Sequence, residues 1–374
     1  MTASSPPLMF MDRHDAECME RTWRALELMH QAPQCGICRP AVVLPLRPSV
    51  ARIAGRHVKA TVATIGGICD EHCRWVTGYQ GLSRRHTEQE LEEYPYDMMS
   101  AVRLGCVGSY LPDPSVALEH RNESVIYVGD LHLHFGHSLT DTMARMWYVV
   151  RHPEVRCRLV MLCNPFWKWG FEGVNPYHSY HMQLLELLGI SSEQLMIVTS
   201  PTRFNEVAVP EQAVYWNDGV CSAAELRCVY DAMAERITPV PCAGAGLYLS
   251  RRAWKTKADG EGYFEDYFAS RGFEVICPEQ LPLEEQLARV AGAEVLACTM
   301  GTLSHLSLFA RAGTRVIHLW RQQRQYNIRQ LLIDELRQLQ SVYVDTAAEG
   351  SNNLHQAMTP GEHWRAFTGS GLLP

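Results

Sequence analysis

The sequence contains no run of about 20 apolar residues, so no segment is predicted to cross a bilayer. Its first 21 residues lack the basic head and apolar block of a secretion signal. The 34 Lys and Arg residues are not clustered and are outnumbered by 41 Asp and Glu residues, which argues against nucleic-acid binding. We therefore predict a cytoplasmic protein without a transmembrane segment, which could lie against the inner face of the membrane.

Several ligand-binding patterns are also missing. The absence of G-x-x-x-x-G-K-[ST] and of G-x-G-x-x-G argues against a P-loop enzyme and an ordinary NAD enzyme. No D-x-D occurs, so a carboxylate pair that would hold Mg²⁺ or Mn²⁺ against a diphosphate has no obvious source. A bound diphosphate would then be neutralised by Arg, His and a helix dipole, with no metal and no cofactor.

The 13 cysteines are an odd number and follow no framework, which favours reduced thiols over disulfides. Cys35 and Cys38 form a C-x-x-C, and Cys69 and Cys73 lie four apart, but no second matching pair completes a zinc site. With 374 residues the chain is long enough for two or three domains with real cores.

Strand-like and helix-like segments alternate in two stretches of the sequence. The first covers residues 124–198, and the second begins after the breaker-rich segment 239–246. Such alternation is typical of βαβ units and parallel sheets, so we predict an α/β protein with two Rossmann-like, doubly wound domains facing a cleft. The predicted divisions are a peripheral arm at 1–40 with a short helix at 16–30, an N-terminal domain at 41–238, and a C-terminal domain at 239–374 that ends in a return segment.

The first candidate site follows the predicted strand that begins at Ser124. A polar cluster runs from Gly129 to His137, and in the next helix His137, Asp141 and Arg145 recur at i, i+4 and i+8. This spacing predicts that a histidine, a carboxylate and an arginine point the same way. The alternative is a surface ion pair of Asp141 with Arg145 and histidines that satisfy loop carbonyls.

A metal site is an alternative for the histidines of this cluster, which are His132, His134 and His137. D-x-H after a strand begins the metallophosphoesterase pattern, and H-x-H begins the amidohydrolase pattern. A metallophosphoesterase also needs G-D-x-x-D and G-N-H for a two-metal site, and neither string occurs. A metal-dependent phosphoesterase or hydrolase stays open as an alternative.

The second candidate site is the segment Cys298–His305, which also follows a strand and opens a helix. Its small residues would let the backbone approach a ligand, and a helix N-terminus suits a diphosphate. Arg251 and Arg252 close an earlier strand, and one guanidinium group could fork onto phosphate oxygens. The alternative is a solvated strand end with a satisfied histidine.

Both sites resemble glycosyltransferase family 61. The segment from His134 to Asp141 resembles the aromatic-x-His-x-x-x-Asp/Glu segment of the family. The whole resemblance spans about residues 124–320. Its second and longer part consists of the L-x-x-S-R strand with Arg251, Gly260-Glu261 in place of Asn-Glu, the run from Gly272 to Glu279, Glu285-Gln286, and Leu303-Ser304-His305. The glycine-rich motif of the family is reduced here to the segment 299–305.

This resemblance implies a GT-B fold, a nucleotide sugar held mainly by the C-terminal domain, inversion at the anomeric carbon, and no requirement for a metal. Asp141 or His137 is then the candidate base, and His134 and Arg145 are further candidates. The candidate donor-binding and phosphate-binding residues are Arg251, Gly301, Thr302, Leu303, Ser304 and His305, with Glu261 and Glu285 for ribose or sugar hydroxyls.

The implied reaction is transfer of a hexosyl, pentosyl or N-acetylhexosaminyl group from a nucleotide sugar, with UDP as the expected nucleotide, to a glycan or lipid-linked acceptor. Polysaccharide biosynthesis, of a capsule or a lipopolysaccharide-type glycan, is the expected process. A catalytically silent nucleotide-sugar binding protein is the second alternative. The sequence leaves open whether the chain forms a homo-oligomer and whether the aromatic segment 164–171 packs in a core or contacts sugar rings or a membrane.

Overall fold

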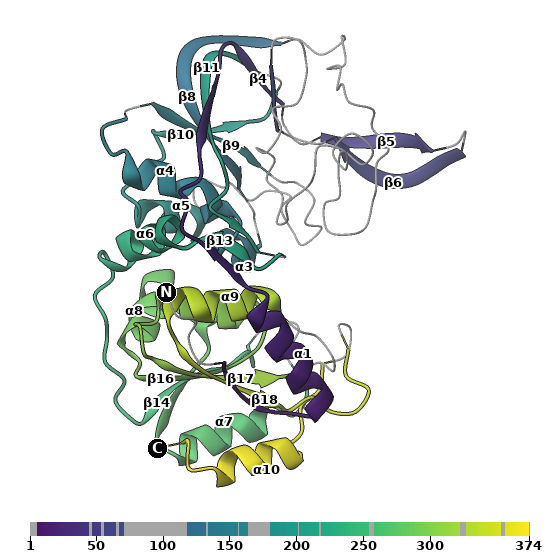
Figure 1. Cartoon of the computed structure of the whole chain (residues 1–374), viewed down its shortest axis with the longest axis vertical. Helices are drawn as coiled ribbons and strands as arrows, with labels where there is room; N and C mark the ends of the chain where they lie inside the picture. Colours follow the sequence, from purple (N-terminus) through teal and green to yellow (C-terminus); the bar gives the residue numbers. More distant parts are fainter. Residues whose placement is uncertain are drawn as a thin grey trace. The chain divides into compact units, whose positions relative to one another are not determined.

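The chain forms two compact units, each described here by itself (Figure 1). The C-terminal unit comprises Met1–Glu27 and Tyr230–Pro374, and the N-terminal unit comprises Leu28–Val229. The computed structural model describes residues 6–44, 47–53, 56–64, 67–70, 118–131, 134–155, 157–163, 180–200, 202–216, 218–253, 258–321, 327–352 and 356–373.

The C-terminal unit is built on a six-stranded sheet in which all neighbouring strands are parallel. Its order is β1-β18-β17-β16-β14-β15. The strands are β1 (Leu8–Phe10), β14 (Gly246–Leu249), β15 (Phe273–Ile276), β16 (Val295–Thr299), β17 (Arg315–Trp320) and β18 (Gln340–Asp345). They are short apolar runs, as expected for a sheet that is covered on both faces.

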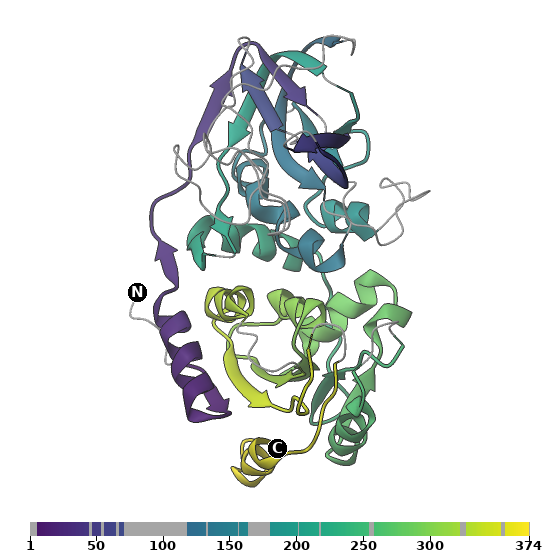
Figure 2. The ribbon, with the colours of Figure 1, turned by 90° about the vertical axis from the view of Figure 1, so that its right-hand side faces the viewer.

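Helices cover the two faces of this sheet (Figure 2). On one face, aromatic residues of α7 (Glu261–Ser270) and α10 (Glu362–Gly369) pack against strand residues such as Tyr248 and Ile317. On the other face, α1 (Arg13–Arg24) and α9 (Ile328–Arg337) pack with Trp320 and Tyr343. The remaining helices of the unit are α8 (Leu283–Gly292), η3 (Pro278–Gln280) and η4 (Thr302–Phe309).

Local chemistry explains where several of these helices begin and end. Leu283, Leu287, Val290 and Ala291 give α8 one buried stripe, and Arg289 lies in its last turn, where positive charge suits the helix dipole. Asn327 caps α9 by accepting a hydrogen bond from the N–H of Gln330.

The strand order creates a switch point between β14 and β16. Along the chain β14 is followed by β15 on one side, and then by β16, β17 and β18 on the other. This is the 2-1-3-4-5 order, and in such sheets ligands bind beyond the carboxyl ends of the two strands at which the order reverses. The residues that follow β14 and β16 are therefore the first place to look for a binding site in this unit.

The N-terminal segment differs from the peripheral arm that we predicted at 1–40. β1 pairs with β18 as an edge strand, and Met11 and Met19 are buried against Trp320 and Tyr343. β3 (Cys35–Cys38) instead joins the sheet of the N-terminal unit. The division between the units falls within α6 (Ala223–Ala234), whereas we predicted it at 238.

The N-terminal unit contains a seven-stranded mixed sheet in the order β10-β9-β8-β11-β4-β7, with β3 also paired to β11. β8, β9, β10 and β11 are parallel neighbours, and the pairings that involve β3, β4 and β7 are antiparallel. The strands are β4 (Ala41–Leu44), β7 (Gly67–Asp70), β8 (Glu119–Leu131), β9 (Arg158–Cys163), β10 (Leu195–Val198) and β11 (Thr202–Pro210).

Smaller elements complete this unit. A three-stranded sheet joins β12 (Val214–Tyr215), β13 (Val220–Ser222) and β2 (Glu27–Met29), and β5 (Arg47–Ile53) pairs with β6 (Arg56–Thr64). The helices, besides α6, are α3 (Phe135–Leu139), η1 (Thr142–Arg145), α4 (Met146–Arg151) and α5 (Tyr180–Glu186).

The predicted α/β class with parallel sheets is confirmed. The GT-B arrangement stays a prediction. Among the helices that the structure describes, none combines the length and the apolar character needed to cross a membrane.

Candidate functional site

Arg251 and Glu261 meet at the carboxyl end of β14. Arg251 lies two residues beyond this strand, and its backbone N–H donates a hydrogen bond of 3.0 Å to Oε1 of Glu261, the first residue of α7. Glu261 is only 3% exposed. The carboxylate thereby fixes the backbone that carries the Arg251 side chain.

The charged side chains of Arg251 and Glu261 are partly shielded from water. Burial lowers the pKa of Arg251, and the negative charges of Glu261 and Glu279 act against that shift. Burial also raises the pKa of Glu261, while the Arg251 N–H and the positive charges of Arg251 and Arg321 oppose the rise. Buried groups of both signs in a ligand-binding position of a parallel sheet are typical of a functional site.

Gly301, which follows β16, faces two guanidinium groups. Its φ of +129° and ψ of −153° are accessible mainly to glycine. A methyl group built on its Cα would lie 2.5 Å from Nη2 of Arg321 and 3.6 Å from Nη1 of Arg251. The absence of a side chain at Gly301 therefore leaves room for both arginines beside the switch-point turn.

Sequence reasoning did not identify Arg321. The sequence pattern could have indicated it, because Arg321 directly follows the strand Arg315–Trp320, much as Arg251 follows β14. The carboxyl ends of neighbouring parallel strands meet at one edge of a sheet, so two arginines at these ends should have been placed together.

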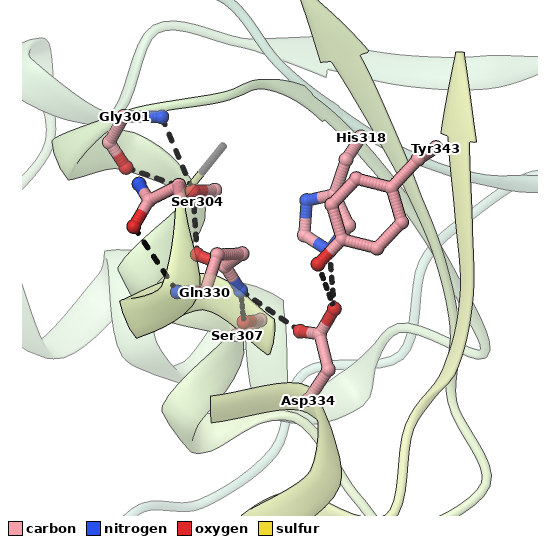
Figure 3. A network of polar contacts seen from close by, with 8 residues as sticks. Gly301, Ser304, Ser307, His318, Gln330, Asp334 and Tyr343 are labelled. Atoms are coloured by element: carbon pink, nitrogen blue, oxygen red, sulfur yellow. Dashed lines mark hydrogen bonds and ion pairs between the residues drawn. The ribbon is translucent and has the colours of Figure 1, made fainter. Parts of the chain in front are cut away.

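A buried polar network lies behind the Gly301 turn (Figure 3). The Gly301 N–H donates to Oγ of Ser304, which in turn lies 2.6 Å from Oε1 of Gln330. The side-chain amide of Gln330 donates to Oγ of Ser307 and, at 2.8 Å, to Oδ1 of Asp334. The network thus connects the turn to the interior of the unit.

Asp334 is the charged centre of this network. Its Oδ2 accepts a hydrogen bond of 2.6 Å from the hydroxyl of Tyr343 and lies 3.0 Å from Nε2 of His318. Burial alone would raise the pKa of Asp334, but the charge of His318 and the hydrogen bonds from His318 and Tyr343 outweigh it, so the pKa is lowered. The polar groups that support the turn are therefore held by an ionised carboxylate.

The other predicted donor-binding residues fall into two groups. Leu303, Ser304 and His305 are buried in η4, and Thr302 at its start is half-buried. Glu285 pairs at 3.2 Å with Arg289, which also binds Glu274 of β15. Arg252 is exposed and pairs with Glu265, so of the two arginines that follow β14 only Arg251 approaches Gly301.

Gly260 explains one departure from the family pattern. It adopts a φ of +85°, and a Cβ at this position would lie 2.3 Å from the carbonyl oxygen of Met358. An asparagine tolerates a positive φ, but its Cβ would collide with that backbone. Glycine is therefore the residue that fits the start of α7 in this chain.

In the N-terminal unit, His137 and Asp141 form a close pair at the end of β8. Nδ1 of His137 lies 2.7 Å from Oδ2 of Asp141, and the Thr140 hydroxyl lies 3.0 Å from the same oxygen. The His137 side chain is 24% exposed and that of Asp141 is 9% exposed. The histidine is thus the more accessible member of the pair, and the ring of His134 stands edge-on to it at 5.2 Å.

The continuous helix that we predicted after His137 is wrong, and with it the common line of His137, Asp141 and Arg145. The chain forms α3, the 3-10 helix η1 and α4 in succession, and the tighter 3-10 turn breaks the i, i+4, i+8 register. Arg145 is 1% exposed, donates to the carbonyl of Pro210, and lies over the ring of Tyr127. These contacts give Arg145 a structural role.

The described residues do not include His132, Cys73 or the aromatic segment 164–171. Within the described ranges, one group of three side chains has the spacing to share a metal ion, and it consists of Asp12, Glu362 and His363 of the C-terminal unit. These residues belong to neither candidate site.

Parallel α/β sheets with charged residues gathered at a switch point define a class of ligand-binding proteins to which many nucleotide-dependent enzymes belong. The family model Glycosyltransferase 61 matches residues 135–317, just under half of the chain. The match begins in α3, two residues before His137, and ends in β17, and over those residues the chain is similar to glycosyltransferase family 61. No curated protein matches the chain.

Proposed function

We propose that this glycosyltransferase uses a nucleotide sugar, with UDP as the expected nucleotide, and inverts the anomeric carbon without a divalent metal ion. The observation that carries the proposal is the position of Arg251 beside Gly301, on the two sides of the switch point. A fixed guanidinium group that is partly desolvated stabilises negative charge on a departing phosphate more strongly than one in water.

The His137–Asp141 pair could accept the proton of the acceptor hydroxyl group. In the proposed step an acceptor hydroxyl oxygen attacks the anomeric carbon on the face opposite the diphosphate. The bond from that carbon to the phosphate oxygen breaks, the electron pair leaves with the nucleoside diphosphate, and the hydroxyl proton passes to the base. Attack on the opposite face inverts the anomeric configuration.

We assign the base to His137 and the orienting role to Asp141. Asp141 is the more buried of the two and lies against Nδ1. In the proposed step Nε2, the other ring nitrogen, takes the proton. A carboxylate in this position holds the imidazole ring and stabilises the imidazolium that forms. The same pair would serve any acceptor that presents a hydroxyl, whether a glycan or a lipid-linked sugar.

Metal independence is supported by the donor side of the site. The sequence lacks D-x-D, and the side chains nearest to the Cβ position of Gly301 are the guanidinium groups of Arg321 and Arg251, which can bind phosphate oxygens directly. Glu261, the buried acid of this corner, is engaged at Oε1 by the Arg251 N–H.

Thermal unfolding with UDP, GDP and CMP in EDTA tests this proposal. A nucleotide at about 100 times its Kd should add roughly 2.7 kcal/mol to the free energy of unfolding. Arg251→Gln should reduce that effect, while Arg252→Gln, which alters the neighbouring exposed arginine, should retain it.

Product analysis separates the remaining outcomes. A panel of nucleotide sugars with mass spectrometry should give a glycosylated acceptor and a free nucleoside diphosphate. Nucleotide binding without any product would indicate a silent binding protein. Stabilisation by Mn²⁺ or Zn²⁺ and by none of the nucleotides would overturn the proposal in favour of a metal-dependent hydrolase.

A further inference from the structure

Arg321 lies at the end of β17 with its guanidinium group against the switch-point turn. The residue is 8% exposed, and Nη2 lies 2.5 Å from the position of a methyl group built on Gly301. Nη1 of Arg251 lies 3.6 Å from the same position. The two guanidinium groups, carried by strands β14 and β17 that flank β16, therefore converge on one small volume.

The charge of Arg321 is not compensated in the usual way. Within the described part of the chain, its Nη1 is buried and has no hydrogen-bond partner. Burial, together with the neighbouring positive charge of Arg251, lowers the pKa of Arg321 to about 9, although the negative charge of Glu261 acts against the shift. A buried cation beside a second cation destabilises a fold unless an anion occupies the site.

We propose that Arg321 is the second diphosphate-binding residue of the donor site, so that Arg251 and Arg321 hold the two phosphates of a nucleotide sugar above Gly301. The inference rests on the proposed function, because it assumes a nucleoside diphosphate sugar as the donor. Arg321 lies beyond residue 317, where the family match ends, so that match assigns it no role.

Three features of the chain fit a ligand with two adjacent negative charges. Each guanidinium group offers a planar fork of N–H donors that matches two phosphate oxygens. Gly301 carries no side chain, so both guanidinium groups can lie close to the backbone of the turn. Trp320, the residue before Arg321, is buried at the end of β17, and the Thr346 N–H donates to its carbonyl oxygen at 3.2 Å, which fixes the backbone from which Arg321 projects.

Calorimetric titration of Arg321→Gln and Arg321→Lys tests the proposal. UDP should bind to Arg321→Gln about 10 to 100 times more weakly than to the original protein, since a charge-assisted pair is lost. Arg321→Lys should lie between the two, because it keeps the charge and loses the fork. Uridine, which has no phosphate, should bind all three proteins equally.

Arg315→Gln is the matched control. Arg315 lies at the opposite end of the same strand, where its guanidinium group donates to the carbonyl of Leu372 at 2.7 Å. The control should bind UDP like the original protein. Circular dichroism spectra of all the variants establish that each is folded.

The outcomes separate this inference from the proposed function. If the original protein binds UDP or another nucleoside diphosphate and Arg321→Gln binds it equally well, the role of Arg321 is wrong and the proposed function stands. If no nucleotide binds but inorganic pyrophosphate does, and Arg321→Gln loses it, the anion site stands and the nucleotide donor is wrong. If neither ligand binds the original protein, both are wrong.

Discussion

At the scale of single residues, the structure separates arginines that the sequence presents as equivalent. Arg252 pairs with Glu265, Arg289 pairs with Glu274 and Glu285, and Arg145 is held by the Pro210 carbonyl. Arg251 and Arg321 instead converge on Gly301. An arginine in an ion pair and one at an anion site look alike in a sequence, so only the partners of each side chain distinguish them.

His137→Ala should remove most of the transfer activity. Loss of a positioned base is expected to reduce kcat by about 10²- to 10⁴-fold. The affinity for UDP should stay unchanged, because we place His137 on the acceptor side. Steady-state kinetics and calorimetric titration measure the two effects, and His152→Ala, which alters an exposed histidine at the end of α4, is the control. Near-normal turnover of His137→Ala would remove the residue from the mechanism.

Gly301→Ala should impair both folding and nucleotide binding. The new alanine would have to adopt a φ of +129°, and its methyl group would displace Arg321. We expect a cost of about 1–3 kcal/mol in the free energy of unfolding. UDP binding should weaken at the same time. Gly313→Ala is the matched control, since Gly313 has a φ of +83° with open space around it, and there only the conformational cost should be seen. Equal UDP affinity in both variants would contradict the assignment of the turn.

At the scale of elements, the alternation of apolar strands and amphipathic helices was sufficient to predict the parallel sheet of the C-terminal unit. β14, β15, β16, β17 and β18 all lie in the second stretch of alternating strand-like and helix-like segments, which begins after the segment 239–246. The helix after His137 was mispredicted because the i, i+4 spacing of polar residues does not reveal a 3-10 turn. The strand β1 was missed because three residues carry too little pattern, and its partner β18 lies at the other end of the chain.

Asp334→Asn should destabilise the C-terminal unit. Asp334 accepts hydrogen bonds from Tyr343 and Gln330 and pairs with His318, so its loss should cost about 3–5 kcal/mol at neutral pH. Because its pKa is lowered in the fold, this stability is present above the ordinary carboxyl pKa and is lost as the pH falls through the lowered value. In acid, the free energy of unfolding measured with denaturant should therefore become similar for the variant and the original protein.

Asp231→Asn provides the control for this series. Its carboxylate is 59% exposed and pairs with Arg337, so its replacement should change the stability by no more than about 1 kcal/mol at any pH. If the free energies of unfolding of Asp334→Asn and the original protein differ by the same amount at every pH, the carboxylate contributes packing and not charge.

At the scale of the whole molecule, the first residues of the chain complete the unit in which we propose the donor site. Met11 and Met19 pack with Met300 and Trp320, which directly precede Gly301 and Arg321. Met19→Ala should therefore lower the free energy of unfolding by about 2–5 kcal/mol. Glu20→Ala, on the exposed side of the same helix, should change it by less than about 1 kcal/mol. Equal free energies of unfolding of the two variants would support the sequence-based prediction that residues 1–40 form a peripheral arm.

The central claim is that a pair of arginines, and not a divalent ion, stabilises the leaving nucleoside diphosphate in an inverting transfer. The most direct measurement is NMR spectroscopy of the reaction of the matching nucleotide sugar and acceptor in EDTA. The account predicts that product forms at an undiminished rate, with an anomeric configuration opposite to that of the donor. A reaction that stops in EDTA and resumes with Mn²⁺, or a product with retained configuration, would contradict it.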